Sequence, residues 1–200
     1  MNIKITINSL LTITLFVLTV LPVLASAQTP KVFESSFYTM NAPENWSLVT
    51  GELNESELRK LPQNLRDQYN AQTTDVMFVN LNDATLKDED FKDSINTVII
   101  DEKIAVSDES LNALKTVLEQ QYQQIFENFK LKKMQIRTIK DTPAFEIIAE
   151  YKILNYELQL QQYLIPSTEK SLVITCTYDI QRQEQLSKIC NDTLEALNFK

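Results

Sequence analysis

The sequence predicts an α+β domain in which a mostly antiparallel central β-sheet carries helices packed on its faces. Two periodicities point to this class. Over residues 107–129, and again over residues 180–197, apolar residues recur at the spacing of an amphipathic helix. Over residues 145–178, apolar and polar residues alternate, which is typical of antiparallel strands with one packed face and one solvated face.

The N-terminal segment 1–27 has the features of an export signal. Lys4 precedes a mainly apolar run over residues 5–24. Pro22 interrupts a helix near the end of this run, and residues 25–27 (ASA) supply the small-x-small pattern of a signal peptidase site. We therefore expect cleavage before Gln28. An uncleaved membrane anchor is the alternative, because a run of this length nearly spans a bilayer.

Cleavage would leave a short flexible leader, 28–32, followed by a single domain, 33–200, that is long enough to bury a core. No cysteine stands at the predicted cleavage point, so a lipid anchor on cysteine is excluded. We expect an exported protein, periplasmic or extracellular, without stable membrane insertion after signal cleavage.

The composition argues against several kinds of chemistry. The chain has no histidine, which removes the commonest general base, imidazole metal ligands and histidine-dependent nucleophiles. Gly51 is its only glycine, so glycine-rich phosphate loops cannot form. A net charge of −8 makes nucleic acid an unfavourable partner. Stability is expected to change little between about pH 5 and 8, where histidine would titrate.

The first half of the domain is predicted to contain strands and a helical cover. Residues 33–40 read as a strand closed by a turn over 41–45, and residues 46–49 begin a second strand. Residues 53–70 are charged and helix-prone, but Pro62 divides them into two short pieces that would lie over the core.

Two further strands precede the longest helix. Residues 75–80 form a nearly all-apolar run, as expected for a strand buried on both faces, and residues 94–100 are rich in β-branched side chains. Ser107 can cap a helix whose first turn is acidic. The helix is predicted to keep one apolar face as far as Phe129; this face contains Leu111, Leu114, Leu118, Tyr122, Ile125 and Phe129.

The second half is predicted to be a four-strand meander and a final helix. The residues expected on its packed face are Phe145, Ile147, Ala149, Tyr151, Ile153, Tyr156, Leu158, Leu160, Leu172, Ile174, Cys176 and Tyr178. The residues expected on its solvated face are Glu146, Glu150, Glu157, Gln159 and Gln161. The final helix, residues 180–197, presents a stripe formed by Leu186, Cys190, Leu194 and Leu197.

Several segments resemble the PsbP/DcrB/Mog-type superfamily. They are FYTMNAPENW (37–46), DVMFVN (75–80), INTVIID (95–101), SLVITCTYD (171–179) and LEALNF (194–199). The resemblance implies a PsbP-like α/β/α sandwich and a non-enzymatic role, as in extrinsic photosystem subunits and envelope lipoproteins. It carries over no site residue. The metal-associated histidines of the photosystem members and the anchoring cysteine of the lipoproteins have no counterpart here.

The only two cysteines, Cys176 and Cys190, stand on a strand and on the helix that follows it. A strand and the helix packed on it can bring two Cα atoms within disulfide range, and export permits oxidation. Two buried free thiols are the alternative. A reactive pair is disfavoured because Cys190 lies in mid-helix without a nearby cation, and two cysteines without histidine make a poor zinc site.

Two other polar segments have both a functional and a purely structural interpretation. The loop 81–93 gathers Asp88, Glu89, Asp90 and Asp93 but lacks the glycine and terminal glutamate of a calcium-binding EF-hand loop, so a solvated loop is favoured. The basic segment 129–140 could dock an acidic partner, although lysines also protect strand edges.

Two further sets of residues have a possible chemical role. The solvated-face carboxylates could form an acid/base pair, but their spacing selects no pair. Asn45, Asn54 and Asn191 begin glycosylation sequons, which matter only in a cell with the machinery for N-glycosylation.

The sequence therefore predicts an exported, non-catalytic domain that acts as an interaction or accessory protein of the cell envelope, with a protein partner there. We expect no catalytic, cofactor-binding or metal-binding residues. A periplasmic or secreted small-molecule or ion-binding protein on the same fold is the alternative. The oligomeric state stays open.

Overall fold

The computed structural model describes residues 32–49, 74–80, 91–153 and 155–200. The predicted signal peptide, nearly all of the predicted leader, the helical cover 53–70 and most of the acidic loop lie outside the described residues. The other predicted elements can be compared with the structure.

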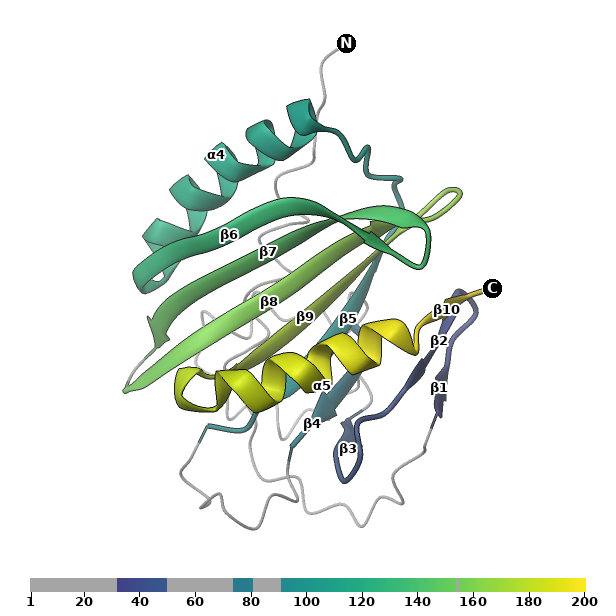
Figure 1. The fold of residues 1–200 in the computed structure, drawn as a ribbon, viewed down its shortest axis with the longest axis horizontal. Helices are drawn as coiled ribbons and strands as arrows, with labels where there is room; N and C mark the ends of the chain where they lie inside the picture. Colours follow the sequence, from purple (N-terminus) through teal and green to yellow (C-terminus); the bar gives the residue numbers. More distant parts are fainter. Residues whose placement is uncertain (1–31, 50–73, 81–90, 154) are drawn as a thin grey trace, which may run out of the picture.

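A seven-stranded antiparallel sheet forms the centre of the domain, in the order β3-β4-β5-β9-β8-β7-β6 (Figure 1). Its strands are β3 (Ser47–Val49), β4 (Thr74–Val79), β5 (Ser94–Ile100), β6 (Glu127–Ile139), β7 (Thr142–Ile153), β8 (Tyr156–Pro166) and β9 (Ser171–Asp179). The predicted meander is β6 to β9, and each of its strands lies beside the next in the chain.

The two described α-helices pack on opposite faces of this sheet. Helix α4 (Asp108–Ile125) contributes Leu114, Leu118 and Tyr122 to one hydrophobic core. Helix α5 (Gln183–Glu195), which follows the 3₁₀ turn η2 (Ile180–Arg182), contributes its apolar stripe to the other core. The expected α+β class, with an antiparallel sheet between helices, is confirmed.

Helix α4 begins as predicted but ends earlier. The Ser107 hydroxyl accepts a hydrogen bond from the Ser110 amide at the N-terminus. Phe126 is already extended and strand β6 starts at Glu127, so the predicted end at Phe129 is wrong. The apolar pattern of the sequence extends beyond the end of the helix because Phe129, although it lies in β6, packs in the same core as α4. The ring centroids of Phe129 and Tyr122 are 5.2 Å apart.

The predicted faces of the meander need correction. Residues directly opposite in antiparallel strands point to the same side of a sheet. Tyr163 pairs with both Glu146 and Ile174, and Gln161 pairs with Cys176. The apolar residues predicted for the packed face of β9 therefore face α5, on the side that carries Glu146, whereas those predicted for β7 face α4.

The predicted solvated face is in fact largely covered by α5. Glu146, Gln159 and Gln161 are all buried. Glu150 is only partly exposed, and Glu157 alone of the predicted set is exposed. The prediction failed because alternation shows that two faces differ in polarity and does not show whether a helix covers the polar one.

A small second sheet, in the order β1-β2-β10, packs beside α5. The single strand predicted over 33–40 is a hairpin of β1 (Val32–Glu34) and β2 (Tyr38–Asn41), whose turn is held by the Ser35 hydroxyl accepting from the Phe37 and Tyr38 amides. The final residues leave the helix and pair with β2 as β10 (Asn198–Phe199). The two chain segments farthest apart in the domain thus lie side by side.

Candidate functional site: a buried polar network beside the disulfide

Cys176 of β9 and Cys190 of α5 form a disulfide, which confirms the favoured interpretation of the sequence. Their Cα atoms are 6.2 Å apart, and both side chains are buried. The bond fastens the middle of α5 to the centre of the sheet, within the core on that side.

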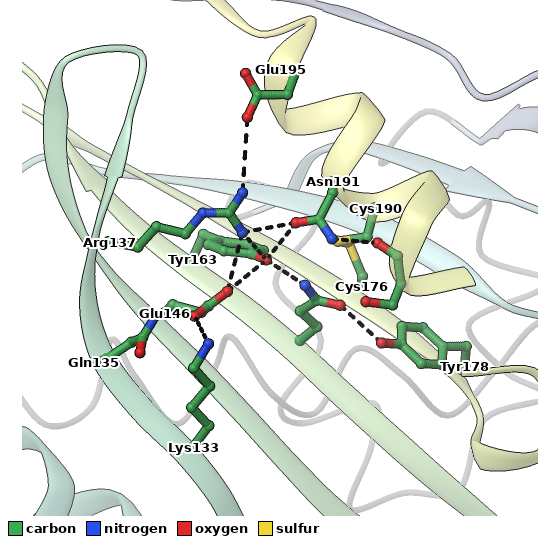
Figure 2. Close-up of polar contacts among 12 residues, drawn as sticks. Lys133, Gln135, Arg137, Glu146, Tyr163, Cys176, Tyr178, Cys190, Asn191 and Glu195 are labelled. Carbon is green, nitrogen blue, oxygen red and sulfur yellow. Dashed lines mark hydrogen bonds and ion pairs between the residues drawn. A yellow bond between two sulfur atoms is a disulfide. The ribbon is translucent and has the colours of Figure 1, made fainter. Parts of the chain in front are cut away.

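Beside the disulfide, the Glu146 carboxylate lies at the centre of a polar network (Figure 2). Only 4% of its side chain is exposed, and it accepts from Lys133 at 2.8 Å and Arg137 at 3.2 Å. The Gln135 amide donates to the same carboxylate at 2.7 Å. Burial works to raise the pKa of Glu146, but the hydrogen bonds from Lys133 and Arg137 outweigh it and hold this pKa below its ordinary value.

The Tyr163 hydroxyl joins this carboxylate to α5. It receives hydrogen bonds from the Gln161 amide and from Arg137, and it lies 3.3 Å from Glu146 and 3.2 Å from the Asn191 side-chain oxygen. The Arg137 guanidinium also stands over the Tyr163 ring, 5.6 Å from its centroid. Burial raises the pKa of Tyr163, so its hydroxyl stays protonated.

Asn191 carries the network onto α5. Its side-chain oxygen accepts from Arg137 at 2.8 Å, and its amide nitrogen donates to the Ser187 carbonyl at 2.8 Å. Both ends of the Asn191 side-chain amide thus have partners within the protein. Asn45 lies in an exposed turn with positive φ, and Asn54 is outside the described residues.

A second chain of contacts runs from Gln161 to Tyr178. The Tyr178 hydroxyl donates to the Gln161 side-chain oxygen at 2.9 Å and accepts from the Gln159 amide at 2.7 Å. Burial raises the pKa of Tyr178. The two glutamines predicted to be solvated therefore satisfy buried tyrosines.

This network is better suited to holding elements together than to moving protons. A carboxylate with several donors and a lowered pKa is a weak base, and tyrosines with raised pKa values are weak acids at neutral pH.

The solvent-facing members of the network, Lys133, Arg137 and Glu195, lie where β6 meets α5. The sequence had placed Lys133 and Arg137 in a basic segment, but it did not single out Tyr163. A signal for Tyr163 was its spacing of two residues from Gln161, which puts it on the same face of β8 as Gln159 and Gln161.

Asp93, the described member of the acidic loop cluster, is buried rather than solvated. Its carboxylate lies 2.6 Å from Arg182, accepts from the Asn80 side-chain amide at 3.3 Å and accepts from the Asp179 backbone amide at 3.3 Å. Burial raises the pKa of Asp93 to about 6, against the lowering effect of Arg182. Within the described residues, no group of three or more acidic or cysteine side chains is placed to hold a metal ion.

The basic segment 129–140 lies in β6, an edge strand of the seven-stranded sheet as described. Lys132 pairs with Glu150 at 3.1 Å, in addition to the Lys133 contact with Glu146. Register shifts interrupt its pairing with β7 at two places. Lysines and bulges both hinder further strands from pairing at such an edge.

None of the described helices combines the length and apolar character needed to cross a membrane.

Comparison with known proteins supports the fold and goes no further. No protein-family model matches this chain, and no curated protein matches its sequence. Among solved structures, cyanobacterial PsbP (CyanoP) from Synechocystis sp. PCC 6803 is similar over 92% of this chain and 99% of its own, with 10% identity and a TM-score of 0.55. LpqN, involved in cell envelope biogenesis of Mycobacterium tuberculosis, matches with 14% identity and a TM-score of 0.48 over 82% of this chain and 83% of its own. The chain therefore has a PsbP-like fold, as the sequence resemblance implied.

Replacing both Cys176 and Cys190 by alanine is expected to lower the free energy of unfolding by about 3 kcal/mol, the chain-entropy value for a loop of this size. Denaturant unfolding measures the change. Reductant should destabilise the wild type by a similar amount and leave the double variant unaffected. Equal stability of oxidised and reduced wild-type protein would contradict the proposed contribution of the bond.

The Asp93 carboxyl gives stability a pH dependence that the absence of histidine did not predict. Its pKa is raised from 3.8 to about 6, so the folded chain binds this proton more tightly than the unfolded chain. The resulting stabilisation, about 3 kcal/mol at most, is complete below pH 3.8 and is lost as pH rises through about 6. Glu146, with its lowered pKa, acts in the opposite direction, losing its contribution only as pH falls below its ordinary value of 4.5.

Unfolding by urea should therefore show stability falling between about pH 5 and 6.5 and levelling off above that range. Asp93→Asn should flatten this slope, whereas the control Asp101→Asn, at an exposed position, should retain it. Stability that rises over the same range in the wild type would refute the role of Asp93.

Proposed function

We propose that this chain is an exported PsbP-like domain that acts without catalysis, as an interaction or accessory protein of the cell envelope. The observation that carries the proposal is the closed network around Glu146. It commits the polar side chains on the α5 face to contacts with one another. A domain held in this way is suited to presenting a fixed surface.

Export is supported by the leader pattern and by the disulfide. Disulfides persist in oxidising compartments such as the periplasm and the extracellular space, and they are rare in the cytosol. The chain joins such a bond to an N-terminal segment with a signal peptidase pattern.

The docking surface that we favour is the solvent side of β6. Lys130 and Lys132 are exposed there, and Lys140 is exposed in the turn that follows, although the whole chain carries a net charge of −8. A positively charged patch on a negatively charged protein favours an acidic protein partner, while the negative net charge disfavours nucleic acid. The register shifts in β6 favour contact through side chains over the addition of a strand.

A small-molecule binding protein is the second candidate function. It is favoured by buried polar atoms on the α4 side of the sheet that have no hydrogen-bond partner within the described residues. The pocket near Lys130 and Glu157 gives it little support, because its volume of about 90 Å³ is well below the roughly 300–1,000 Å³ of typical ligand sites.

The docking proposal predicts that neutralising Lys130 and Lys132 together, each to glutamine, weakens capture of the partner from the native envelope fraction about tenfold, a loss of roughly 1.4 kcal/mol. Quantitative mass spectrometry of the captured proteins measures this. The matched control neutralises the exposed residues Lys103 and Lys170 instead, which removes the same charge outside β6 and outside the helix α4 that packs against it.

Capture by the wild type should also weaken as salt is raised, because exposed charges are screened within about 10 Å at 0.1 M salt. Equal losses in the test and control variants would count against β6 as the docking surface. Turnover of a substrate by the purified protein would overturn the non-catalytic assignment.

A further inference from the structure

The α4 side of the sheet holds buried polar atoms that the protein does not satisfy. Within the described part of the chain, the side-chain atoms without a hydrogen-bond partner are Asn96 Nδ2, Gln121 Oε1, Tyr151 OH, Gln162 Oε1 and Thr177 Oγ1. In native proteins most buried polar atoms are paired, so each exception needs an explanation. Four of these atoms belong to strands of the central sheet and one to α4.

Strand register places the central members in one row. Asn96 of β5 pairs with Thr175 of β9, and Thr175 pairs with Gln162 of β8. Gln162 in turn pairs with Ile147, which belongs to the core beneath α4. The side chains of this row therefore project toward the α4 side.

The other unpartnered atoms lie outside this row, on the sheet strands β7 and β9 and on α4. Thr177 follows Thr175 on the same face of β9, and Tyr151 belongs to the same core. Their hydroxyls lie near each other in a geometry that falls short of a hydrogen bond. Gln121 lies on α4, next to the buried residue Tyr122.

The donors and acceptors of the row can be assigned. Gln162 donates through Nε2 to the Thr175 hydroxyl at 2.9 Å, which leaves its Oε1 as a free acceptor. Asn96 offers Nδ2 as a free donor. Both residues are at least 98% buried, so bulk water does not reach them easily. The row thus presents one unused donor and one unused acceptor, both uncharged.

The α5 face shows that this chain can satisfy glutamines in a similar position. Gln159 and Gln161, on the same strand as Gln162, meet tyrosine hydroxyls. On the α5 face the glutamine amides are paired, whereas on the α4 face amide atoms of Asn96 and Gln162 are not. This difference between the two faces argues that the unpaired amide atoms have a partner from outside the chain.

We infer that the row of Asn96, Thr175 and Gln162 is a binding site for a small uncharged ligand with a carboxamide or peptide group. Such a group accepts through its carbonyl, matching Asn96 Nδ2, and donates through its N–H, matching Gln162 Oε1. A charged ligand does not fit, because no residue of the row can compensate the desolvation of a charge. This site is separate from the β6 docking surface.

The test is a titration of ¹⁵N-labelled protein with N-acetylglycinamide, followed through the side-chain amide signals of Asn96 and Gln162. We expect saturable shifts of both signals. Gln162→Met should weaken binding about tenfold, the loss expected for one hydrogen bond. The matched control Gln159→Met, on the same strand but the other face, should bind as the wild type does.

A second pair of variants guards against loss of fold. Thr177→Val and Tyr151→Phe each remove an unpartnered hydroxyl while keeping the shape of the side chain, so their melting temperatures should equal or exceed that of the wild type. The inference is overturned if N-acetylglycinamide gives no saturable shift, as it would if the atoms meet only ordered water. Equal weakening in Gln159→Met and Gln162→Met would overturn it as well.

Discussion

The buried carboxylate of Glu146 is the constraint on which the arrangement of the α5 face depends. Taking a carboxylate out of water costs several kcal/mol unless donors replace the lost hydration. Here β6 supplies the replacement through Lys133, Gln135 and Arg137. Because these donors must face Glu146 from the neighbouring strand, the network favours the observed pairing of β6 with β7.

Arg137 extends this constraint to the last helix. It contacts Glu146 on β7, Tyr163 on β8 and Asn191 on α5. The disulfide adds a covalent link from α5 to β9, one residue before Asn191. Helix α5 has 13 residues, too few to be stable alone in water, so its position depends on these links and on its apolar stripe. The surface where β6 meets α5 is consequently well defined, which suits a docking role.

Much of the fold was predictable because local rules decide it. Ser107 begins α4 as a capping residue should, and alternation located the strands of the meander. The disulfide followed from Cys176 and Cys190 lying on faces that a strand and the next helix turn toward each other.

The position of Glu146 was not predictable in this way. A polar residue in an alternating strand has the same sequence signature whether water or a helix covers it, and only the register of β6 to β9 together with the path of α5 decides the matter. The row beneath α4 was hidden for the same reason, since Asn96 and Gln162 lie 66 positions apart in the sequence and are brought into one row only because each pairs with Thr175.

The central claim is that Glu146 and Arg137 act as one unit that fixes α5 on the sheet, and a double-mutant cycle tests it most directly. Glu146→Gln, Arg137→Met and the double variant would be compared by urea unfolding at neutral pH. The account predicts a coupling free energy of about 1–3 kcal/mol, as expected for residues within one network. It also predicts a smaller loss in the double variant than the sum of the two single losses. Additivity within about 0.5 kcal/mol would show that the two residues contribute independently, and would contradict the account.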